Sequence, residues 1–378
     1  MSHRHPLFCV IPPYMLERIA EKGTEVQQER ARQALALSEQ MREQRQKVAV
    51  RAEALRTAGP AVRQRSVHSA QYLSNLPGVL VRAEGAAPSG DPAVDEAYDG
   101  SGATYDLFWD IYQRNSIDGA GMPLVSTVHY QQGYDNAFWN GYQMVYGDGD
   151  EDLPEEDRLF NRFTISLDVI GHELTHGVTQ YTANLTYANQ SGALNESFSD
   201  VFGSLVRQYQ LRQTAAEADW IIGKGLFTAN VNGVGLRSMK EPGTAYNDPI
   251  LGKDPQPGHM RDYVTTTRDN GGVHINSGIP NHAFYYAAIE MGGYAWEKAG
   301  RIWYVTLRDR LRAGSTFQDA ANLTFAVAGD LFGVNSLEQQ AVKRAWSLVG
   351  IEVTGDGGGN GNQNPGCLDA FIRLLRGV

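Results

Sequence analysis

The pattern of hydrophobic and polar positions changes period along the chain. Apolar residues recur at helical spacing from about Met15 to Arg56, with an interruption near Gly23. Residues 66–150 then form short alternating runs between glycine-rich segments, which predicts strands, while Ala93–Tyr112 has the pattern of a helix. The expected strands are Val79–Arg82, Leu124–Tyr130 and Gln143–Asp150.

The helical period returns at Asn161. It predicts helices over residues 164–181, 194–211, 277–293, 294–312, 316–332 and 336–348. The second half of the chain is therefore expected to be mainly α-helical. A chain of 378 residues, of which 42% are hydrophobic, is long enough for two domains and additional segments.

Breaks in composition suggest where these segments meet. Gly59-Pro60 and the basic residues 63–65 indicate an exposed linker, at which proteolysis is also expected. Residues 353–364 have the composition of a flexible linker, and Cys367–Val378 alternates like a short amphipathic helix, to which we assign no function. The expected organisation is 1–65, 66–163, 164–352 and 353–378.

The net charge of -10 is unevenly distributed. Residues 1–65 carry a net charge of +5, so the rest of the chain carries -15. The acidic body argues against nucleic acid as the main partner, and it suits docking of the basic N-terminal segment. The alternative is that residues 25–56 form only a solvated helix.

The two cysteines, Cys9 and Cys367, lie at opposite ends in segments that look peripheral, and each is expected to be a free thiol. They exclude a disulfide framework and a metal site closed by thiolates. No run approaches the roughly 18 apolar residues of a membrane span. Residues 6–11 are apolar, but they are followed by prolines and charges, so an ordinary secretory signal peptide is not expected.

Residues 172–176 read His-Glu-Leu-Thr-His and are the strongest chemical signal in the chain. On a helix, His172 and His176 lie one turn apart and can bind one ion, while Glu173 faces its open side. Two imidazoles and one carboxylate would leave a fourth tetrahedral position for water, as a catalytic zinc site requires. The pattern also occurs by chance, so the prediction needs further residues.

Glu196 and Asp200 are the further candidate residues of the metal site, because they share one face of the next predicted helix. We expect this helix to follow a break at Gly192. Glu196 is the candidate third ligand. Asp200, with Asn195 beside it, is the candidate acceptor for the second ring N–H of a ligand histidine. The alternative is a solvated helical face. His129, in a predicted strand, is expected to be a packed or surface residue rather than a ligand.

Several blocks of sequence resemble the thermolysin family of zinc endopeptidases. Residues 171–176 and 192–200 carry the metal-site blocks of that family. Residues 136–141 (Asn-Ala-Phe-Trp-Asn-Gly), 235–239 (Gly-Leu-Arg-Ser-Met) and 269–278 match further blocks in the same order. The resemblance covers about residues 70–352. Residues 11–16 (Ile-Pro-Pro-Tyr-Met-Leu) and the short pro-segment are similar to the protealysin branch.

The resemblance implies an α+β fold with two lobes, a β-rich N-terminal lobe and a helical C-terminal lobe, with the zinc site in the cleft between them. It implies one catalytic Zn²⁺ ion bound by His172, His176 and Glu196. Zinc would activate a water molecule, and Glu173 would take the proton of that water and pass it to the leaving amine.

The resemblance also assigns roles outside the zinc helix. His274 and Tyr187 match the residues that stabilise the oxyanion, and Asp269 matches the acid that holds the imidazole of His274. Without the resemblance, His274 would be interpreted as a turn residue near a Gly-Gly bend. Asn136, the Ala137 carbonyl and Arg237 match groups that bind the substrate backbone.

Four further positions match the pocket for the residue that follows the cleaved bond, namely Phe160, Phe163, Val169 and Leu236. All four are apolar, so a preference for bulky hydrophobic residues is expected, with Phe163 making the pocket smaller than leucine would. The alternative for each is plain core packing.

One departure concerns calcium. Asp168 and Asp219 match the paired-calcium site of the family, but Arg207, Ile221 and Lys224 stand where carboxylates are expected. Calcium needs six to eight oxygen ligands, and cations in the cage repel it. We expect the double site to be lost, with the two cations paired to the two aspartates.

The resemblance makes residues 1–65 an inhibitory propeptide that binds in cis. We expect its residues Pro12, Pro13, Tyr14, Met15 and Leu16 to lie across the cleft until the chain is cut between about Ala58 and Ser69.

The expected protein is a monomeric neutral zinc endopeptidase that acts on polypeptides and is exported without an ordinary signal peptide; a cytoplasmic location is the alternative. A catalytically silent zinc-stabilised binding protein is a competing interpretation, against which the retained Glu173, Tyr187 and His274 argue. An aminopeptidase would need an acidic anchor for the substrate amine, and the sequence offers no candidate for one.

Overall fold

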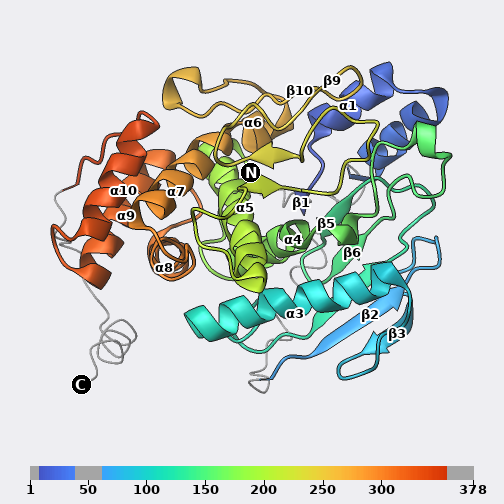
Figure 1. Ribbon diagram of the computed structural model, residues 1–378, viewed down its shortest axis with the longest axis horizontal. Helices are drawn as coiled ribbons and strands as arrows, with labels where there is room; N and C mark the ends of the chain where they lie inside the picture. The colour runs from blue at the N-terminus through green and yellow to red at the C-terminus, as the bar shows by residue number, and fades with distance from the viewer. Residues whose placement is uncertain (1–7, 39–61, 356–378) are drawn as a thin grey trace.

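The computed structural model describes residues 8–38 and 62–355, which form a β-containing lobe and a helical lobe (Figure 1). Within these residues the larger sheet has six strands in the order β1-β5-β6-β4-β2-β3. The strands are β1 (Phe8–Cys9), β2 (Arg65–Ser69), β3 (Val79–Ala83), β4 (Leu124–Val128), β5 (Ala137–Trp139) and β6 (Met144–Tyr146). Helix α3 (Pro92–Tyr112) packs along this sheet. It begins after Asp91, whose carboxylate accepts hydrogen bonds from the amides of Ala93 and Val94.

The helical lobe is arranged around two long helices, α4 (Leu167–Gln180) and α5 (Asn189–Leu211), at the centre of the molecule (Figure 1). Its other helices are α6 (Asp269–Asn276), α7 (Gly278–Met291), α8 (Ala299–Val305), α9 (Phe317–Phe332) and α10 (Leu337–Leu348), with the π-helix η4 (Thr306–Arg310). The short elements are η1 (Glu155–Asp157), η2 (Phe163–Ile165), η3 (Met260–Asp262), β7 (Ile221–Ile222), β8 (Arg237–Ser238), β9 (Asn247–Asp248) and β10 (Gly252–Lys253).

Two glycines allow α4 and α5 to approach closely. A Cβ atom on Gly203 would lie 2.4 Å from the carbonyl oxygen of Asp168. A Cβ atom on Gly171 would lie 3.0 Å from the Cα atom of Gly203. Because glycine has no side chain, the two backbones can come together at this point. The side chains that follow Gly171 on α4 are thereby brought within hydrogen-bonding reach of α5.

The N-terminal segment is part of the folded body. Strand β1 pairs antiparallel with β5 and forms one edge of the sheet. Helix α1 (Pro13–Lys22) buries Met15, Leu16 and Ile19, and after the expected bend at Gly23 a second helix continues over residues 25–38. Arg30 on this helix contacts Asp150 at 3.2 Å and Asp152 at 2.7 Å. This is the docking expected from the opposite charges of the two parts.

Most predicted helices are confirmed to within a few residues, and two boundaries are wrong. Helix α5 begins at Asn189 and has no break at Gly192, where a Cβ atom would lie 2.4 Å from the Val273 side chain. Glycine is needed there for packing rather than for ending a helix. The helix predicted over residues 294–312 is divided between α8 and η4.

Two expectations about peripheral segments also change, and others are not tested. Cys9 is not peripheral, because it lies in β1 and is only 7% exposed. Arg65 is not in an exposed linker, because it begins β2 and pairs with Glu84 at 2.6 Å. The expected linker and helix after residue 355 lie outside the described residues, as do residues 39–61 around the proposed boundary.

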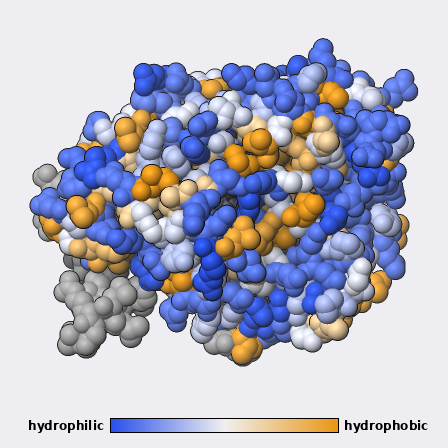
Figure 2. Space-filling model, viewed as in Figure 1, coloured by the Kyte–Doolittle hydropathy of each residue, from blue (hydrophilic) through white to orange (hydrophobic). Residues whose placement is uncertain are grey.

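None of the helices within residues 8–38 and 62–355 is both long and apolar enough to cross a bilayer. The face shown in Figure 2 is mostly hydrophilic, with apolar side chains in separate patches.

His129 is a packed residue, as expected, and it bridges two carboxylates. It follows β4, and its ring nitrogens lie 2.7 Å from Asp148 and 2.9 Å from Asp91. The hydrogen bond to Asp148 outweighs the opposing effect of burial and raises the pKa of His129 from 6.5 to about 9. The ring is therefore cationic at neutral pH and ties the start of α3 to the loop after β6.

This linkage predicts a pH-dependent contribution to stability. Because the pKa of His129 is raised in the folded state, the contribution is complete below about pH 6.5 and is lost as the pH rises through about 9. We expect His129→Gln to lower the melting temperature at pH 6 and to have a much smaller effect at pH 10, measured by differential scanning calorimetry. His68→Gln is the control, because the His68 ring contacts Ser66 rather than a carboxylate. Equal effects of His129→Gln at both pH values would contradict the linkage.

Candidate metal centre

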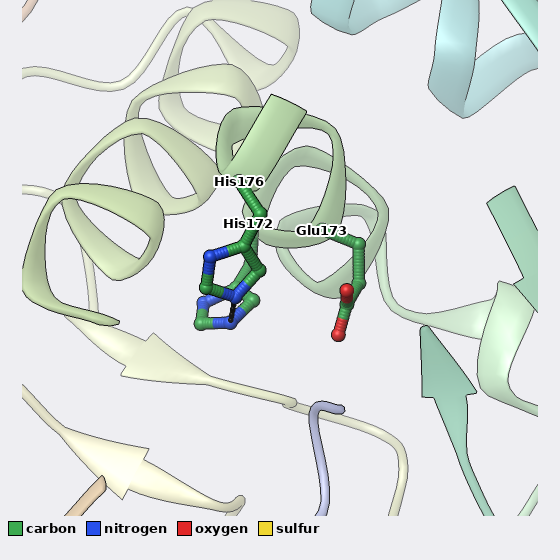
Figure 3. A group of neighbouring side chains, drawn as sticks. All are labelled: His172, Glu173 and His176. Atoms are coloured by element: carbon green, nitrogen blue, oxygen red, sulfur yellow. Dashed lines mark hydrogen bonds between the residues drawn. The ribbon is translucent and has the colours of Figure 1, made fainter. Parts of the chain in front are cut away.

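Helix α4 presents three candidate residues on one side. In Figure 3, the rings of His172 and His176 and the carboxylate of Glu173 project from α4 into the same space. All three are fully buried. The Nε2 atoms of the two rings are 3.1 Å apart, and one ligand atom from each of the three residues fits within a 4.8 Å cluster.

A fourth side chain reaches this cluster from α5. The Glu196 carboxylate oxygens lie 3.5 Å from Nε2 of His172 and 3.5 Å from Nε2 of His176. Its Oε2 atom is buried and has no hydrogen-bond partner. Both Glu173 and Glu196 are thus close enough to be ligands. Glu196 fits better as the third ligand, because its two oxygens face both imidazole Nε2 atoms.

The far side of each imidazole is held by α5. Nδ1 of His172 lies 2.8 Å from Asp200, and Nδ1 of His176 lies 2.8 Å from Asn195 and 3.0 Å from Ser199. These contacts orient the rings with Nε2 toward the cluster. Ser199 was not predicted, although it lies one helical turn after Asn195 and so shares its face.

Asp200 is itself held in place by Arg237 from β8 and by Asn281 from α7. Two Arg237 nitrogens donate to the Asp200 carboxylate at 2.8 Å each, and the Asn281 amide donates at 2.8 Å. Burial opposes ionisation of Asp200, but Arg237 and His172 hold its pKa well below the ordinary value. Asn281 is a second residue that sequence reasoning missed.

Two proton donors lie beside the cluster. The Tyr187 hydroxyl donates to Glu196 and lies 3.1 Å from Nε2 of His274. Burial, with the nearby Glu196, raises the pKa of Tyr187 well above its usual value. Asp269 contacts Nδ1 of His274 at 2.6 Å, and although burial acts in the opposite direction, Asp269 and Glu196 raise the pKa of His274 to about 9. Both groups therefore carry a proton at neutral pH.

The donor set fits zinc. Two ligands at the usual 2.0–2.1 Å from a tetrahedral zinc ion are about 3.3 Å apart. The two imidazole Nε2 atoms are 3.1 Å apart, and each lies 3.5 Å from a Glu196 oxygen; both separations are close to this value. The buried Oε2 atom of Glu196 has no hydrogen bond and lies 3.5 Å from Nε2 of His172, an arrangement that suits a carboxylate ligand of a shared metal ion.

The N-terminal segment lies directly against these residues. The Cys9 carbonyl oxygen is 3.2 Å from Nε2 of His274. The Val10 amide donates to the Ala137 carbonyl at 3.2 Å, and the Ile11 amide donates to Oδ1 of Asn136 at 3.0 Å. Asn136 and Ala137 therefore hold the extended backbone of residues 10 and 11.

The predicted inhibitory segment, Pro12–Leu16, stays a prediction. We expected Pro12–Leu16 to cross the cleft; the residues just before it, 9–11, make the backbone contacts given above, and Pro13 begins α1. Pro13 and Leu16 still line, with Tyr187 and His274, a cavity of about 170 Å³. The extended stretch ends at Pro12, and Pro13 takes the first position of the helix, where its missing N–H is not needed.

The four pocket residues stay a prediction. Phe160, Phe163, Val169 and Leu236 are all at most 1% exposed, and the rings of Phe160 and Phe163 are 6.0 Å apart. Burial of this kind is compatible with a pocket wall and with core packing.

The cations expected to replace calcium pair with the two aspartates. Arg207 lies 3.2 Å from Asp168 and 2.8 Å from Asp219, and Lys224 lies 2.7 Å from Asp219. The predicted ion pairs are thus present.

Comparison with known proteins agrees with this geometry. Residues 45–180 match the family described as "Thermolysin metallopeptidase, catalytic domain" and residues 183–351 match "Thermolysin metallopeptidase, alpha-helical domain". The chain belongs to the thermolysin family of metallopeptidases. It is a zinc metalloprotease, as the family match and the cluster of His172, Glu173 and His176 show. It has a propeptide, because residues 9–47 match "Protealysin propeptide".

Individual proteins similar in sequence or structure agree with membership of the thermolysin family. It is 54% identical to an extracellular metalloprotease of Pectobacterium carotovorum subsp. carotovorum, over 92% of this chain and 97% of that one. It is 55% identical to protease PrtS of Photorhabdus sp. (strain Az29), over 76% of each chain. The precursor of protealysin from Serratia proteamaculans has a similar structure, with a TM-score of 0.81 and 51% identity over 91% of this chain and 99% of that one. The expected thermolysin-like fold is confirmed.

The contact between Asp200 and His172 predicts an effect on zinc affinity. Asp200→Asn keeps the size of the side chain but removes the charge that orients the His172 ring, and such partners typically change metal affinity about 10–100-fold. We expect weaker zinc binding in competition titrations with a chromophoric chelator. Asp168→Asn is the control, because Asp168 is equally buried but pairs with Arg207. Equal zinc affinity of the two variants would contradict the role of Asp200.

Proposed function

We propose that this protein is a zinc endopeptidase that hydrolyses internal peptide bonds on the N-terminal side of bulky hydrophobic residues, and that residues 1–65 inhibit it in cis. The observation that carries the proposal is an extended peptide backbone bound against the cluster. The Cys9 carbonyl faces His274, while Asn136 and Ala137 bind the two following amides. An endopeptidase needs such a strand-binding edge next to its metal.

Zinc bound to His172, His176 and Glu196 would lower the pKa of a water ligand and polarise the carbonyl of the substrate. Glu173 is the proposed base that moves the proton of the attacking water to the leaving nitrogen. Its Oε2 atom accepts a hydrogen bond of 3.0 Å from the Trp139 amide of β5. The base is thus attached to the strand that binds the peptide, which fixes its position relative to the substrate.

His274 and Tyr187 are the proposed donors to the oxygen that becomes negative during the attack. The raised pKa of each keeps it protonated at neutral pH, which supports this role. Arg237 lies 3.4 Å from the Val10 carbonyl and supports the proposed contact with a substrate carbonyl. Because Arg237 also holds Asp200, substrate binding and orientation of His172 would share one side chain.

The preference for bulky hydrophobic residues depends on Phe160, Phe163, Val169 and Leu236. Their apolar, buried side chains support the proposal. An extracellular site of action is supported by the Pectobacterium relative, which is named an extracellular metalloprotease. We further propose that the processed protein acts as a monomer.

Replacing Glu173 or Glu196 with glutamine distinguishes the role of the proposed base from that of the proposed ligand. Glu173→Gln should keep one zinc ion per chain, measured by inductively coupled plasma mass spectrometry. It should lower kcat/KM on casein or an internally quenched peptide by about 10²–10⁴-fold, the usual contribution of a general base. Glu196→Gln should lose zinc and activity together. Loss of zinc from Glu173→Gln, with retention in Glu196→Gln, would reverse the two assignments.

We also propose that the paired-calcium site is absent. The guanidinium of Arg207 and the ammonium of Lys224 occupy the space around Asp168 and Asp219 that calcium would need. Calcium added to the zinc-loaded protein should therefore leave its melting temperature unchanged in a thermal-shift titration. An increase in melting temperature that saturates with calcium, and that disappears in Asp219→Asn, would overturn this proposal.

A further inference from the structure

Residues 9–11 make a complete series of backbone contacts with the cleft. The Cys9 carbonyl faces His274 at 3.2 Å, and the Val10 amide donates to Ala137 at 3.2 Å. The Val10 carbonyl accepts from Arg237 at 3.4 Å, and the Ile11 amide donates to Asn136 at 3.0 Å. Each of these partners is a group to which the proposed function assigns a contact with substrate.

The order of the contacts identifies one peptide bond. Strand β1 runs antiparallel to β5, with Phe8 opposite Trp139 and Cys9 opposite Phe138. The carbonyl before the cleaved bond should face the oxyanion donor His274, and the amide after it should be held by β5. The bond that satisfies both conditions is Cys9–Val10. Val10, which follows this bond, is an aliphatic residue and is fully buried.

We propose that the Cys9–Val10 bond is held in the position of the cleaved bond and is hydrolysed in place in the zinc-loaded precursor, an inference that rests on the proposed function. Water adds across the amide: its oxygen bonds to the Cys9 carbonyl carbon, and the carbon–nitrogen bond breaks. Glu173 transfers the proton, so that Cys9 becomes a carboxylate and Val10 a free amine. No other reactant is needed.

This cut does not activate the protein, because the product stays bound. Residues after Val10 are anchored by the buried Met15, Leu16 and Ile19 of α1. They are also anchored by the ion pairs of Arg30 with Asp150 and Asp152. The new Val10 amine is therefore retained at the site at high effective concentration. On the other side of the cut, the described residues Phe8 and Cys9 pair with β5.

The test uses the full chain, purified in chelator and then given zinc. Intact mass and N-terminal sequencing should show loss of residues 1–9 and a new chain that begins at Val10, before casein hydrolysis appears. Glu173→Gln should show no such cut. The rate should be independent of protein concentration, because the bond is cut within one molecule. A first cut elsewhere, or a rate proportional to concentration, would overturn the proposal.

A separate assay distinguishes failure of this inference from failure of the proposed function. The same protein, after its N-terminal segment has been removed by limited proteolysis, is tested on an internally quenched peptide. Peptide hydrolysis with an intact Cys9–Val10 bond in the precursor would overturn only the inference. Absence of peptide hydrolysis by zinc-containing processed protein would overturn the proposed function.

A second measurement does not depend on activity. In the zinc-free Glu173→Gln protein, Cys9 should resist alkylation, since it is only 7% exposed, with peptide mapping used to separate it from Cys367. Adding Val10→Asp should increase the rate of Cys9 alkylation at least tenfold, because it places a charge at a fully buried position. Val26→Asp is the matched control, because Val26 lies on the helix over residues 25–38 and is 47% exposed. Equal alkylation rates with both substitutions would contradict the proposed position of Val10.

Discussion

The metal centre depends on the close approach of α4 and α5. A side chain larger than glycine at position 203 would push the two helices apart, since even a Cβ atom would lie 2.4 Å from the Asp168 carbonyl. The short distance between the two helices lets side chains of α5 contact the histidines of α4. Asp200 and Asn195 contact the rings of α4 at 2.8 Å, a distance at which a shift of one ångström ends the hydrogen bond. Both the orientation of the histidines and the position of Glu196 follow from this contact.

Because the cluster is buried, its charges have to be balanced within the protein. Asp200 is ionised although it is fully buried, because the guanidinium of Arg237 binds both of its oxygens. Arg237 in turn has a carbonyl of the bound peptide within reach. A series of contacts therefore joins the bound backbone to His172 through two charged side chains. Arg237 thus both balances the buried charge of Asp200 and contacts the bound peptide.

Local periodicity accounts for what the sequence predicted well. His172 and His176, like Glu196 and Asp200, are one helical turn apart, and this spacing is visible in the chain whatever the tertiary structure. The contact of Ile11 with Asn136 joins residues 125 positions apart, and no local pattern records it. Gly192 was interpreted as a helix end because its packing against Val273 depends on the tertiary fold. Cys9 was placed at the periphery for the same reason, since its burial comes from pairing with β5.

The position of the N-terminal segment has a consequence for latency. Strand β5 offers backbone groups that any extended peptide can bind, so the cleft cannot distinguish an inhibitor from a substrate by main-chain contacts alone. What distinguishes this segment is attachment: it belongs to the same chain, and α1 and Arg30 hold it at the cleft. An intramolecular ligand competes at an effective concentration in the millimolar range, about the upper end of typical KM values. Latency therefore depends on the attachment of the N-terminal segment to the rest of the protein. The peptide bond held in the cleft need not differ chemically from a substrate bond.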